Sequence, residues 1–192
     1  MRPDLASVSL EALQAQLQTW GEPAYRAEQL FRWLHRRGVR RFDEMTDLSR
    51  DLRARLAETY DLAPLTVAKV EKARDGTRKY AFRTAQGDTI ESVFIPDASA
   101  EGRNSLCISS QVGCGIDCKF CLTASLGFIR NLSFSEIVEQ VTRVKEDLRQ
   151  DGVASGVQNL VFMGMGEPRA NYRSVIRALH VLNSPLGHEM SM

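Results

Sequence analysis

The sequence predicts a mixed α/β chain in three segments: a helical module over residues 1–63, a small antiparallel sheet with its linker over 64–104, and parallel βα units over 105–192. Three observations predict this order. Apolar residues recur at helical spacing as far as about Leu62. They then form short runs split by glycine-containing turns, and after residue 105 strand-like and helix-like stretches alternate.

The composition is that of a globular protein. Of the 192 residues, 43% are hydrophobic and 26% are charged, which is enough for one sizeable core or two small ones. The 25 basic and 24 acidic residues give a net charge of +1, which excludes a protein that holds nucleic acid by bulk charge alone. No apolar run approaches the ~18 residues of a membrane helix, and residues 1–14 do not resemble a signal peptide. We therefore expect a cytoplasmic protein.

The helical module carries a basic stretch. Its second helix is predicted to open near Ala24, after Pro23, and to end at Gly38, a residue that suits the left-handed position past a helix end. Six arginines against the single acid Glu28 give this stretch a local charge of +5: Arg26, Arg32, Arg36, Arg37, Arg40 and Arg41. It is either a solvated helix face or a surface that contacts RNA phosphates.

Turn residues and a helix-capping motif predict the elements of the next two segments. Asp75-Gly76 and Gln86-Gly87 separate three strand-like runs and predict hairpins, and residues 97–104 read as a linker. After it we expect a strand (105–110), a cysteine loop, a helix (133–150), a strand (157–163) and a helix (172–182). Ser133 followed by Glu136 predicts a capping box. Two βα units cannot close a barrel, so the domain is either small and open or part of a longer protein.

All four cysteines fall within fifteen residues. Cys114, Cys118 and Cys121 form a Cys-x3-Cys-x2-Cys motif, and Cys107 precedes it in a strand-like run. Three thiolates on one loop can ligate a four-iron, four-sulfur cluster and leave one iron open, and that iron can chelate S-adenosylmethionine. The alternative is a structural zinc site with Cys107 as the fourth ligand, which the spacing disfavours. Phe120, between the last two cysteines, would shield the iron and pack near the adenine of the nucleoside.

A glycine-rich turn follows the second strand of this segment. Met163-Gly164-Met165-Gly166-Glu167-Pro168 comes directly after an apolar run. Glycines at the end of a strand let a ligand approach the backbone, and Glu167 with exposed carbonyls could accept hydrogen bonds from an ammonium group. Alone this turn is an ordinary βα connection. Taken with the upstream cysteine motif, it becomes a specific signal.

Together these motifs resemble the radical S-adenosylmethionine RNA methyltransferases that methylate carbon 2 of adenine. The resemblance runs from about Tyr25 to Asn183, and it implies a radical S-adenosylmethionine (βα) barrel of which this chain holds the N-terminal part. The residues that carry it are Asp43-Glu44-Met45-Thr46-Asp47-Leu48-Ser49, Ser109-Ser110-Gln111-Val112-Gly113, the cysteine motif, Gly127-Phe128-x-Arg130-Asn131-Leu132, Gly164-Met165-Gly166-Glu167-Pro168 and Asn171-Tyr172.

The resemblance also implies roles that spacing does not show. Cys114, Cys118 and Cys121 match the cluster ligands, and Gly166 and Glu167 match the turn that binds S-adenosylmethionine.

Two further positions gain a role from the resemblance. Glu91 matches the proton acceptor, although alone it reads as a solvent-facing strand residue. Cys107 matches the cysteine that resolves a covalent protein–RNA intermediate by forming a disulfide, although alone it reads as a core cysteine.

In that family one S-adenosylmethionine methylates a protein cysteine, a second supplies the radical that activates this methyl, and the methylene radical adds to adenine. The methyl-carrying cysteine lies in the family's C-terminal half, and no cysteine follows Cys121 here. We therefore expect an N-terminal portion that is inactive alone. The implied partners are large-subunit ribosomal RNA, transfer RNA, in which the modified adenine lies next to the anticodon, and an electron donor such as flavodoxin. The enzyme is expected to be a monomer that does not bind a membrane. The alternatives are methylation at adenine carbon 8, which confers antibiotic resistance, and a non-catalytic zinc-stabilised RNA-binding module.

Overall fold

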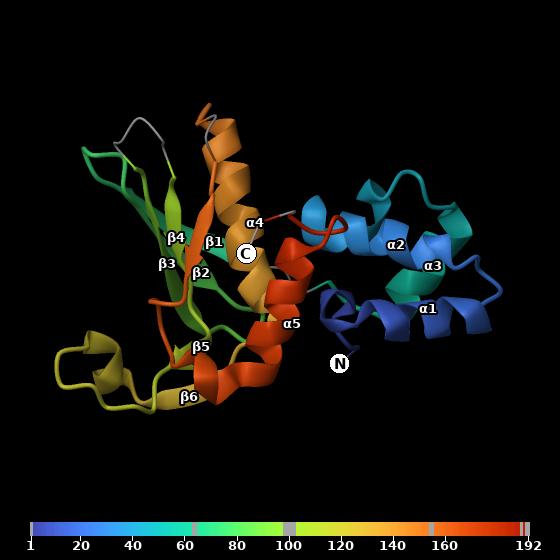
Figure 1. The fold of residues 1–192 in the computed structure, drawn as a ribbon. Helices are drawn as coiled ribbons and strands as arrows, with labels where there is room; N and C mark the ends of the chain where they lie inside the picture. Colours follow the sequence, from blue (N-terminus) through green and yellow to red (C-terminus); the bar gives the residue numbers. More distant parts are fainter. Residues whose placement is uncertain (1, 63–64, 98–102, 154–155, 189, 191–192) are drawn as a thin grey trace. The chain divides into compact units, whose positions relative to one another are not determined.

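The structure is a computed structural model that describes residues 2–62, 65–97, 103–153, 156–188 and 190 (Figure 1). The chain divides into two compact units, Met1–Pro64 with His180–Met192, and Leu65–Leu179. The first unit is helical, and the second contains the sheets. No helix within the described ranges is long and apolar enough to cross a membrane.

Short helices build the first unit, as the helical spacing predicts. They are η1 (Leu5–Ser7), α1 (Leu10–Thr19), α2 (Tyr25–Phe31), η2 (Arg32–Arg36), η3 (Phe42–Glu44) and α3 (Arg50–Thr59). Ser9 and Ser49 begin α1 and α3, because their hydroxyls accept hydrogen bonds from backbone N–H groups of the first turn. The apolar positions meet in one core that includes Leu13, Leu17, Leu30, Leu34, Met45, Leu52 and Leu56.

The predicted second helix is present but ends in a wider turn. The segment η2 is π-helical, and Arg37 N donates to Arg32 O at 3.0 Å. Gly38 then has φ +61°, the left-handed conformation predicted for the residue past the helix end.

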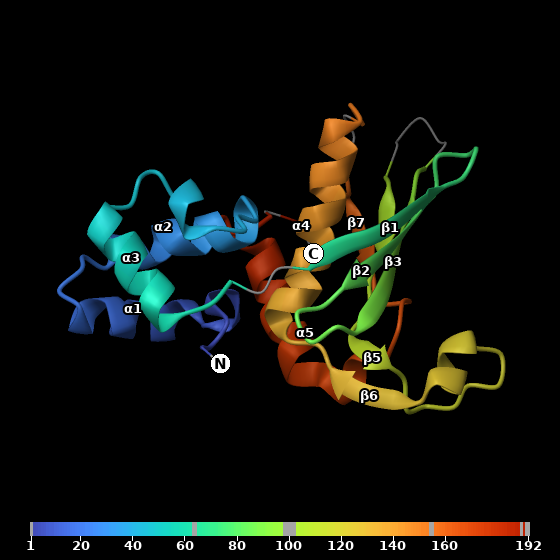
Figure 2. The same ribbon diagram turned by 180° about the vertical axis from the view of Figure 1, so that it is seen from behind.

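A five-stranded sheet of order β1-β2-β3-β4-β7 forms the frame of the second unit (Figures 1 and 2). Its strands are β1 (Thr66–Lys72), β2 (Arg78–Arg83), β3 (Thr89–Ile95), β4 (Ser105–Cys107) and β7 (Asn159–Val161). The turns predicted at Asp75-Gly76 and Gln86-Gly87 join antiparallel pairs, and both glycines have positive φ.

The second sheet segment continues directly from the first. β3 pairs with β4 antiparallel, and β4 pairs with β7 parallel, so both predicted segments share one sheet. The described sheet is open, and one parallel pair is seen in it. A mixed α/β fold is therefore observed, while the predicted partial barrel is not confirmed. Of the predicted linker 97–104, residues 98–102 lie outside the described residues.

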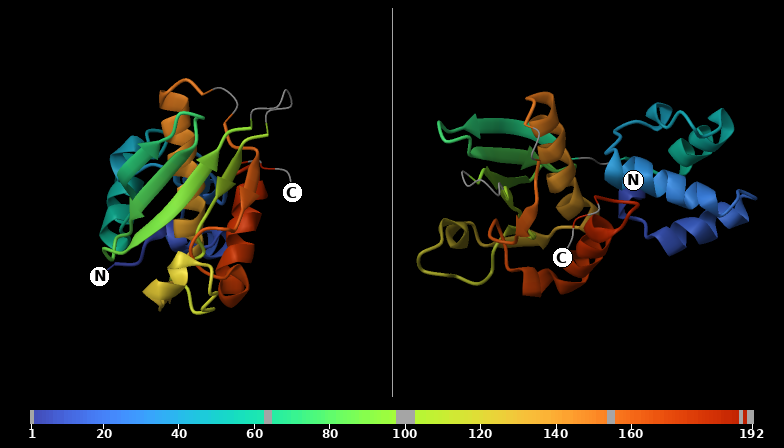
Figure 3. Two further views of the ribbon diagram at one scale, coloured as in Figure 1. Left: turned by 90° about the vertical axis from the view of Figure 1, so that its left-hand side faces the viewer. Right: turned by 45° about the horizontal axis from the view of Figure 1, so that its top comes forward.

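Helix α4 (Phe134–Gln150) covers one face of this sheet, as Figure 3 shows. The predicted capping box starts it, since the Ser133 hydroxyl accepts from Glu136 N while the Glu136 carboxylate accepts from Ser133 N. Alternate residues of β2 and β3 are buried on the helix side: Tyr80, Phe82, Ile90, Ser92 and Phe94. The residues between them face the other way and are partly exposed, and no described helix of this unit covers that face.

Candidate functional site

A short hairpin carries the three cysteines of the motif. β5 (Gln111–Gly113) leads into the cysteine loop, and β6 (Phe128–Asn131) leads out of it (Figure 1). Cys114 follows β5 directly, and its N donates to Gly127 O at 2.9 Å, which closes the neck of the loop. The sequence pattern did not reveal this hairpin, because both strands are too short to show an alternation of apolar and polar residues.

The neck of the loop requires glycine. Gly113 has φ +72°, and a Cβ built on it would lie 1.9 Å from Gly127 O. Only a residue without a side chain lets the two strands come this close while adopting a left-handed conformation. The neck therefore fixes where the cysteine loop starts and ends.

The thiols differ in their electrostatic surroundings. All four cysteines are free and of intermediate exposure. Hydrogen bonds from Thr123, first its backbone N–H, lower the pKa of Cys121 and favour the thiolate, the form that binds metals. Burial raises the pKa of Cys107 and favours its neutral thiol. The contrast suits Cys121 better than Cys107 as a metal ligand.

The three cysteines of the motif share a loop, but the structure does not bring their thiols together as a metal site. Among the residues that the structure describes, no three histidine, cysteine, aspartate or glutamate side chains are close enough to hold a metal ion. The donor chemistry nevertheless fits an iron–sulfur cluster, because three partly exposed thiols stand at Cys-x3-Cys-x2-Cys spacing on one loop. Binding a cluster would have to draw this loop inward.

Apolar side chains of the cysteine loop and β6 face solvent. Phe120 is 94% exposed and Leu122 in η4 (Leu122–Leu126) is 85% exposed. More than half of each of four further side chains is exposed: Ile116, Leu126, Phe128 and Ile129. Phe120, predicted to shield the iron, is thus exposed on the loop, between two of the three cysteines.

The glycine-rich turn is bound to the segment that leads into the cysteine loop. Gly164 N donates to Ile108 O at 3.1 Å, and Met165 N donates to the Ser109 hydroxyl at 2.9 Å. Glu167 N donates to Gln111 Oε1 at 2.9 Å. The predicted cofactor-binding turn and the cysteine hairpin therefore lie side by side, although they are far apart in the sequence.

The glycines of this turn are needed by the protein backbone itself. A Cβ on Gly164 would lie 2.7 Å from the Ser109 hydroxyl. Gly166 has φ +94°, and a Cβ on it would lie 2.5 Å from Gln111 Cβ. Glu167 begins the short helix η5 (Pro168–Asn171), since its Oε1 accepts from Arg169 N at 3.0 Å. One Glu167 oxygen thus has a structural partner.

Glu91 and Cys107 lie on the same uncovered face of the sheet. Cys107 pairs with Val93 across β3 and β4, and Glu91 is two residues before Val93 on the same strand. Such diagonal neighbours in an antiparallel pair are about 7–8 Å apart. The Glu91 carboxylate forms an ion pair with Lys79 Nζ at 2.8 Å, and both side chains are nearly half exposed.

The predicted site residues lie at one end of the sheet, where the parallel strands β4 and β7 finish. β4 and β7 are parallel, so their carboxyl ends, which continue into the cysteine hairpin and the glycine-rich turn, meet there. β3 runs antiparallel to β4, so the beginning of β3, with Glu91, lies at the same end of the sheet. Ligands of open α/β sheets bind at the carboxyl ends of parallel strands.

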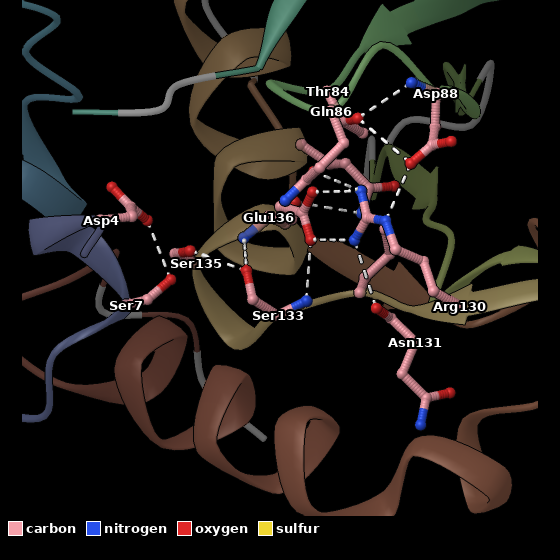
Figure 4. Close-up of polar contacts among 12 residues, drawn as sticks. Asp4, Ser7, Thr84, Gln86, Asp88, Arg130, Asn131, Ser133, Ser135 and Glu136 are labelled. Atoms are coloured by element: carbon pink, nitrogen blue, oxygen red, sulfur yellow. Dashed lines mark hydrogen bonds and ion pairs between the residues drawn. The ribbon is translucent and has the colours of Figure 1, made fainter. Parts of the chain in front are cut away.

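Arg130 anchors the far strand of the cysteine hairpin (Figure 4). Its guanidinium donates to Asp88 and to Gln86 at 2.8 Å, both in the β2–β3 turn region, and to both oxygens of Glu136 at 2.8 and 2.9 Å. The pKa of Arg130 is raised, chiefly by its hydrogen bonds to Glu136. The sequence pattern did not assign it this role, although Arg130 stands in a motif that carries the family resemblance.

Replacing Arg130 by alanine is expected to lower the free energy of unfolding by about 2 kcal/mol, because Asp88 and Glu136 are left partly buried without their cation. Urea unfolding followed by circular dichroism measures this. Arg173→Ala, at an exposed position of α5 (Tyr172–Asn183), is the control and should change stability by less than about 0.5 kcal/mol. Equal effects of the two variants would contradict an anchoring role.

The arginines in the second half of the basic stretch are exposed, and several have partners within the first unit. Arg36 donates to Pro185 O at 3.0 Å, Arg37 lies over the Trp33 ring at 4.0 Å, and Arg41 forms an ion pair with Asp43. The guanidinium of Arg41 is thus partly neutralised.

Comparison with known families gives a match in the first unit. Residues 3–62 match the family described as "Ribosomal RNA large subunit methyltransferase N-terminal domain".

Relatives match along nearly the whole chain. "Dual-specificity RNA methyltransferase RlmN" of Syntrophobacter fumaroxidans is 51% identical over 183 residues, which are 95% of this chain and 52% of that protein. The protein of the same name from Geobacter sulfurreducens is 48% identical over 179 residues, 93% of this chain and 47% of that protein. The chain spans about half the length of the curated relatives it matches.

A solved structure has the same fold. The crystal structure of a radical SAM methyltransferase from Sphaerobacter thermophilus matches with a TM-score of 0.85 and 37% identity, covering 98% of this chain and 54% of that one. The match extends over nearly the whole of this chain.

Proposed function

We propose that this chain belongs to the family of the RlmN dual-specificity RNA methyltransferases, and that it contributes to methylating carbon 2 of adenine in large-subunit ribosomal RNA and in transfer RNA next to the anticodon. One observation carries the proposal beyond family membership. Glu91, Cys107 with the base of the cysteine hairpin, and the glycine-rich turn lie at the same end of the sheet, and they come from three separate parts of the sequence.

Each cofactor has residues that fit it. Cys114, Cys118 and Cys121 would hold a four-iron, four-sulfur cluster, with Phe120 covering it. The Gly166-Glu167 backbone and carboxylate would hold the amino acid part of S-adenosylmethionine. When bound, this pair supplies one electron and a 5'-deoxyadenosyl radical. The chain's own task is to place both groups next to the uncovered face of the sheet.

Glu91 and Cys107 would act on the RNA adduct. Glu91 accepts the proton from carbon 2, a step that its position on the uncovered face supports. Cys107 then resolves the link between protein and RNA: its sulfur bonds to the sulfur of a cysteine that this chain does not contain, the carbon–sulfur bond of the adduct breaks, and the carbon keeps the electrons and takes up a proton as the new methyl group. Burial raises the pKa of Cys107 and so favours its neutral, less nucleophilic thiol.

The proposed partners follow from this chemistry. Ribosomal and transfer RNA are the substrates, and a small electron-transfer protein such as flavodoxin is the donor for a monomer in the cytoplasm.

Replacing Cys107 by alanine tests the proposed reaction in the intact protein. Without the resolving thiol, turnover should stop after the carbon–carbon bond forms, so protein crosslinked to RNA accumulates and is visible on denaturing gels. Mass spectrometry of ribosomal and transfer RNA from a deletion strain should show 2-methyladenosine restored by the wild-type gene and not by Cys107→Ala. Normal turnover by the variant, or restoration of 8-methyladenosine instead, would contradict the proposal.

The first unit is proposed to bind RNA through its basic stretch. Reversing Arg36 and Arg40 to glutamate should weaken RNA binding and reduce its dependence on salt, by a logarithmic slope of about 0.7 to 0.9 for each phosphate that is no longer neutralised. Filter binding at several salt concentrations measures both quantities. Arg74→Glu with Arg149→Glu, exposed in the second unit, is the charge-matched control. Unchanged affinity and slope for the first pair would make the stretch a solvated helix face.

A further inference from the structure

We propose that Gln111 is a positioning residue that holds the glycine-rich turn and the cysteine hairpin in one fixed relation. Gln111 is the first residue of β5 and is 3% exposed. Its side-chain amide bridges the two loops, one atom to each. The ligand that this relation serves, S-adenosylmethionine beside a cluster, rests on the function proposed above.

On the side of the turn, Gln111 makes three contacts. Its Oε1 accepts from Glu167 N at 2.9 Å, and its backbone N donates to Met165 O at 3.2 Å. Its Cβ lies where a side chain on Gly166 would have to go, with a built Cβ only 2.5 Å away. The turn therefore cannot slide along β5 without breaking hydrogen bonds or overlapping this side chain.

On the side of the hairpin, Gln111 Nε2 donates to Asn131 Oδ1 at 2.7 Å. Gln111 and Asn131 are also register partners between β5 and β6. Cys114 follows three residues after Gln111, directly beyond the end of β5. Turning the Gln111 amide over would set its NH2 group against Glu167 N, donor against donor, so the two contacts fix its orientation together.

The chemistry gives this bridge a purpose. A reacting atom bound by the turn must lie within about 0.5 Å of its productive position relative to a group held by the cysteine loop. The cysteine loop is exposed at its tip, so its position relative to the turn has to be set at its base. A buried amide bonded to both elements does this.

The hairpin should survive the loss of this amide. Asn171 Nδ2 donates to Ser110 O and Leu132 O, both at 2.8 Å, and so joins the two ends of the hairpin independently of Gln111. Variants at Gln111 are therefore expected to fold, and thermal unfolding checks this.

Hydrogen exchange on the chain without cofactors tests the coupling. In Gln111→Ala, amide exchange should rise about tenfold or more in both the turn (163–168) and the hairpin (111–131), because each loses a buried hydrogen bond. Gln111→Glu keeps the acceptor for Glu167 N, so exchange in the turn should stay closer to that of the wild type than in Gln111→Ala. Gln16→Ala, at a partly exposed position of α1 in the first unit, should change neither. Unchanged hairpin exchange in Gln111→Ala would overturn the proposal.

S-adenosylmethionine binding then tests the purpose. With iron and sulfide restored under anaerobic conditions, Gln111→Ala should keep the wild-type iron content but bind S-adenosylmethionine about tenfold more weakly and lose the change that binding causes in the cluster's electron paramagnetic resonance signal. Wild-type affinity and signal in the variant would overturn the positioning role. A wild-type chain that takes up no iron would contradict the proposed function, and hydrogen exchange would still decide whether Gln111 couples the two elements.

Discussion

Alanine at any one of Cys114, Cys118 or Cys121 is expected to abolish the iron–sulfur cluster. Three thiolates are the smallest set that holds a cube with one open iron, so no single loss can be tolerated. Purified without oxygen, the wild-type protein should be brown, whereas each alanine variant should be colourless, with iron and labile sulfide close to zero. Because all three residues stand on an exposed loop, the same variants should unfold at nearly the wild-type urea concentration in the absence of iron.

Cys107→Ala is the matched control for this result. Cys107 is in β4, outside the loop, and its raised pKa disfavours a metal-bound thiolate, so the variant should keep its full iron and sulfide. A zinc site would behave differently, because Cys107 would then be the fourth ligand. One zinc per wild-type chain, lost in Cys107→Ala, would establish the structural alternative.

Gly166→Ala is expected to give the largest loss of stability among substitutions in the glycine-rich turn, about 3 kcal/mol. Its φ of +94° costs an alanine roughly 1 kcal/mol, and overlap with Gln111 adds about 2 kcal/mol. Urea unfolding of the second unit measures the effect. S-adenosylmethionine binding to the iron-loaded protein should fall below detection, because the turn that would hold it has moved.

Gly152→Ala separates the two causes. Gly152 also has positive φ, +73°, but no atom lies within 4 Å of a Cβ built on it. Its alanine variant should lose only the conformational part, about 1 kcal/mol, and keep its affinity for S-adenosylmethionine. If both variants lost the same stability, close approach to Gln111 would not explain why glycine stands at position 166.

Local features of the fold were predictable because their causes lie within a few residues. The Ser133 and Glu136 capping box, the turns at Gly76 and Gly87 and the left-handed Gly38 each follow from a short pattern and are all present. The β5–β6 hairpin and the pairing of β3 with β4 were not predicted. They depend on contacts between distant segments. Strands of three residues are too short to show the alternation of apolar and polar residues that predicts a strand.

The candidate site divides in the same way. The sequence pattern itself drew attention to the cysteine loop and to the glycine-rich turn. Glu91 and Cys107 drew attention only through a family resemblance, since their common face depends on the register of Val93 with Cys107. Gln111 and Arg130 had no signal of their own, because a polar residue in a short strand is ordinarily a surface residue.

The carboxylate of Glu136 serves two elements at once. It caps α4 by accepting from Ser133 N, and it binds the Arg130 guanidinium through both oxygens. Unravelling the first turn of α4 and detaching β6 therefore release the same group, so the two events should open as one cooperative unit in native-state exchange. The part of the hairpin left to move independently is the segment between the two neck residues, 115–126. A cluster bound there, as proposed, would remodel that segment while the sheet, the helix and the base of the hairpin stay folded.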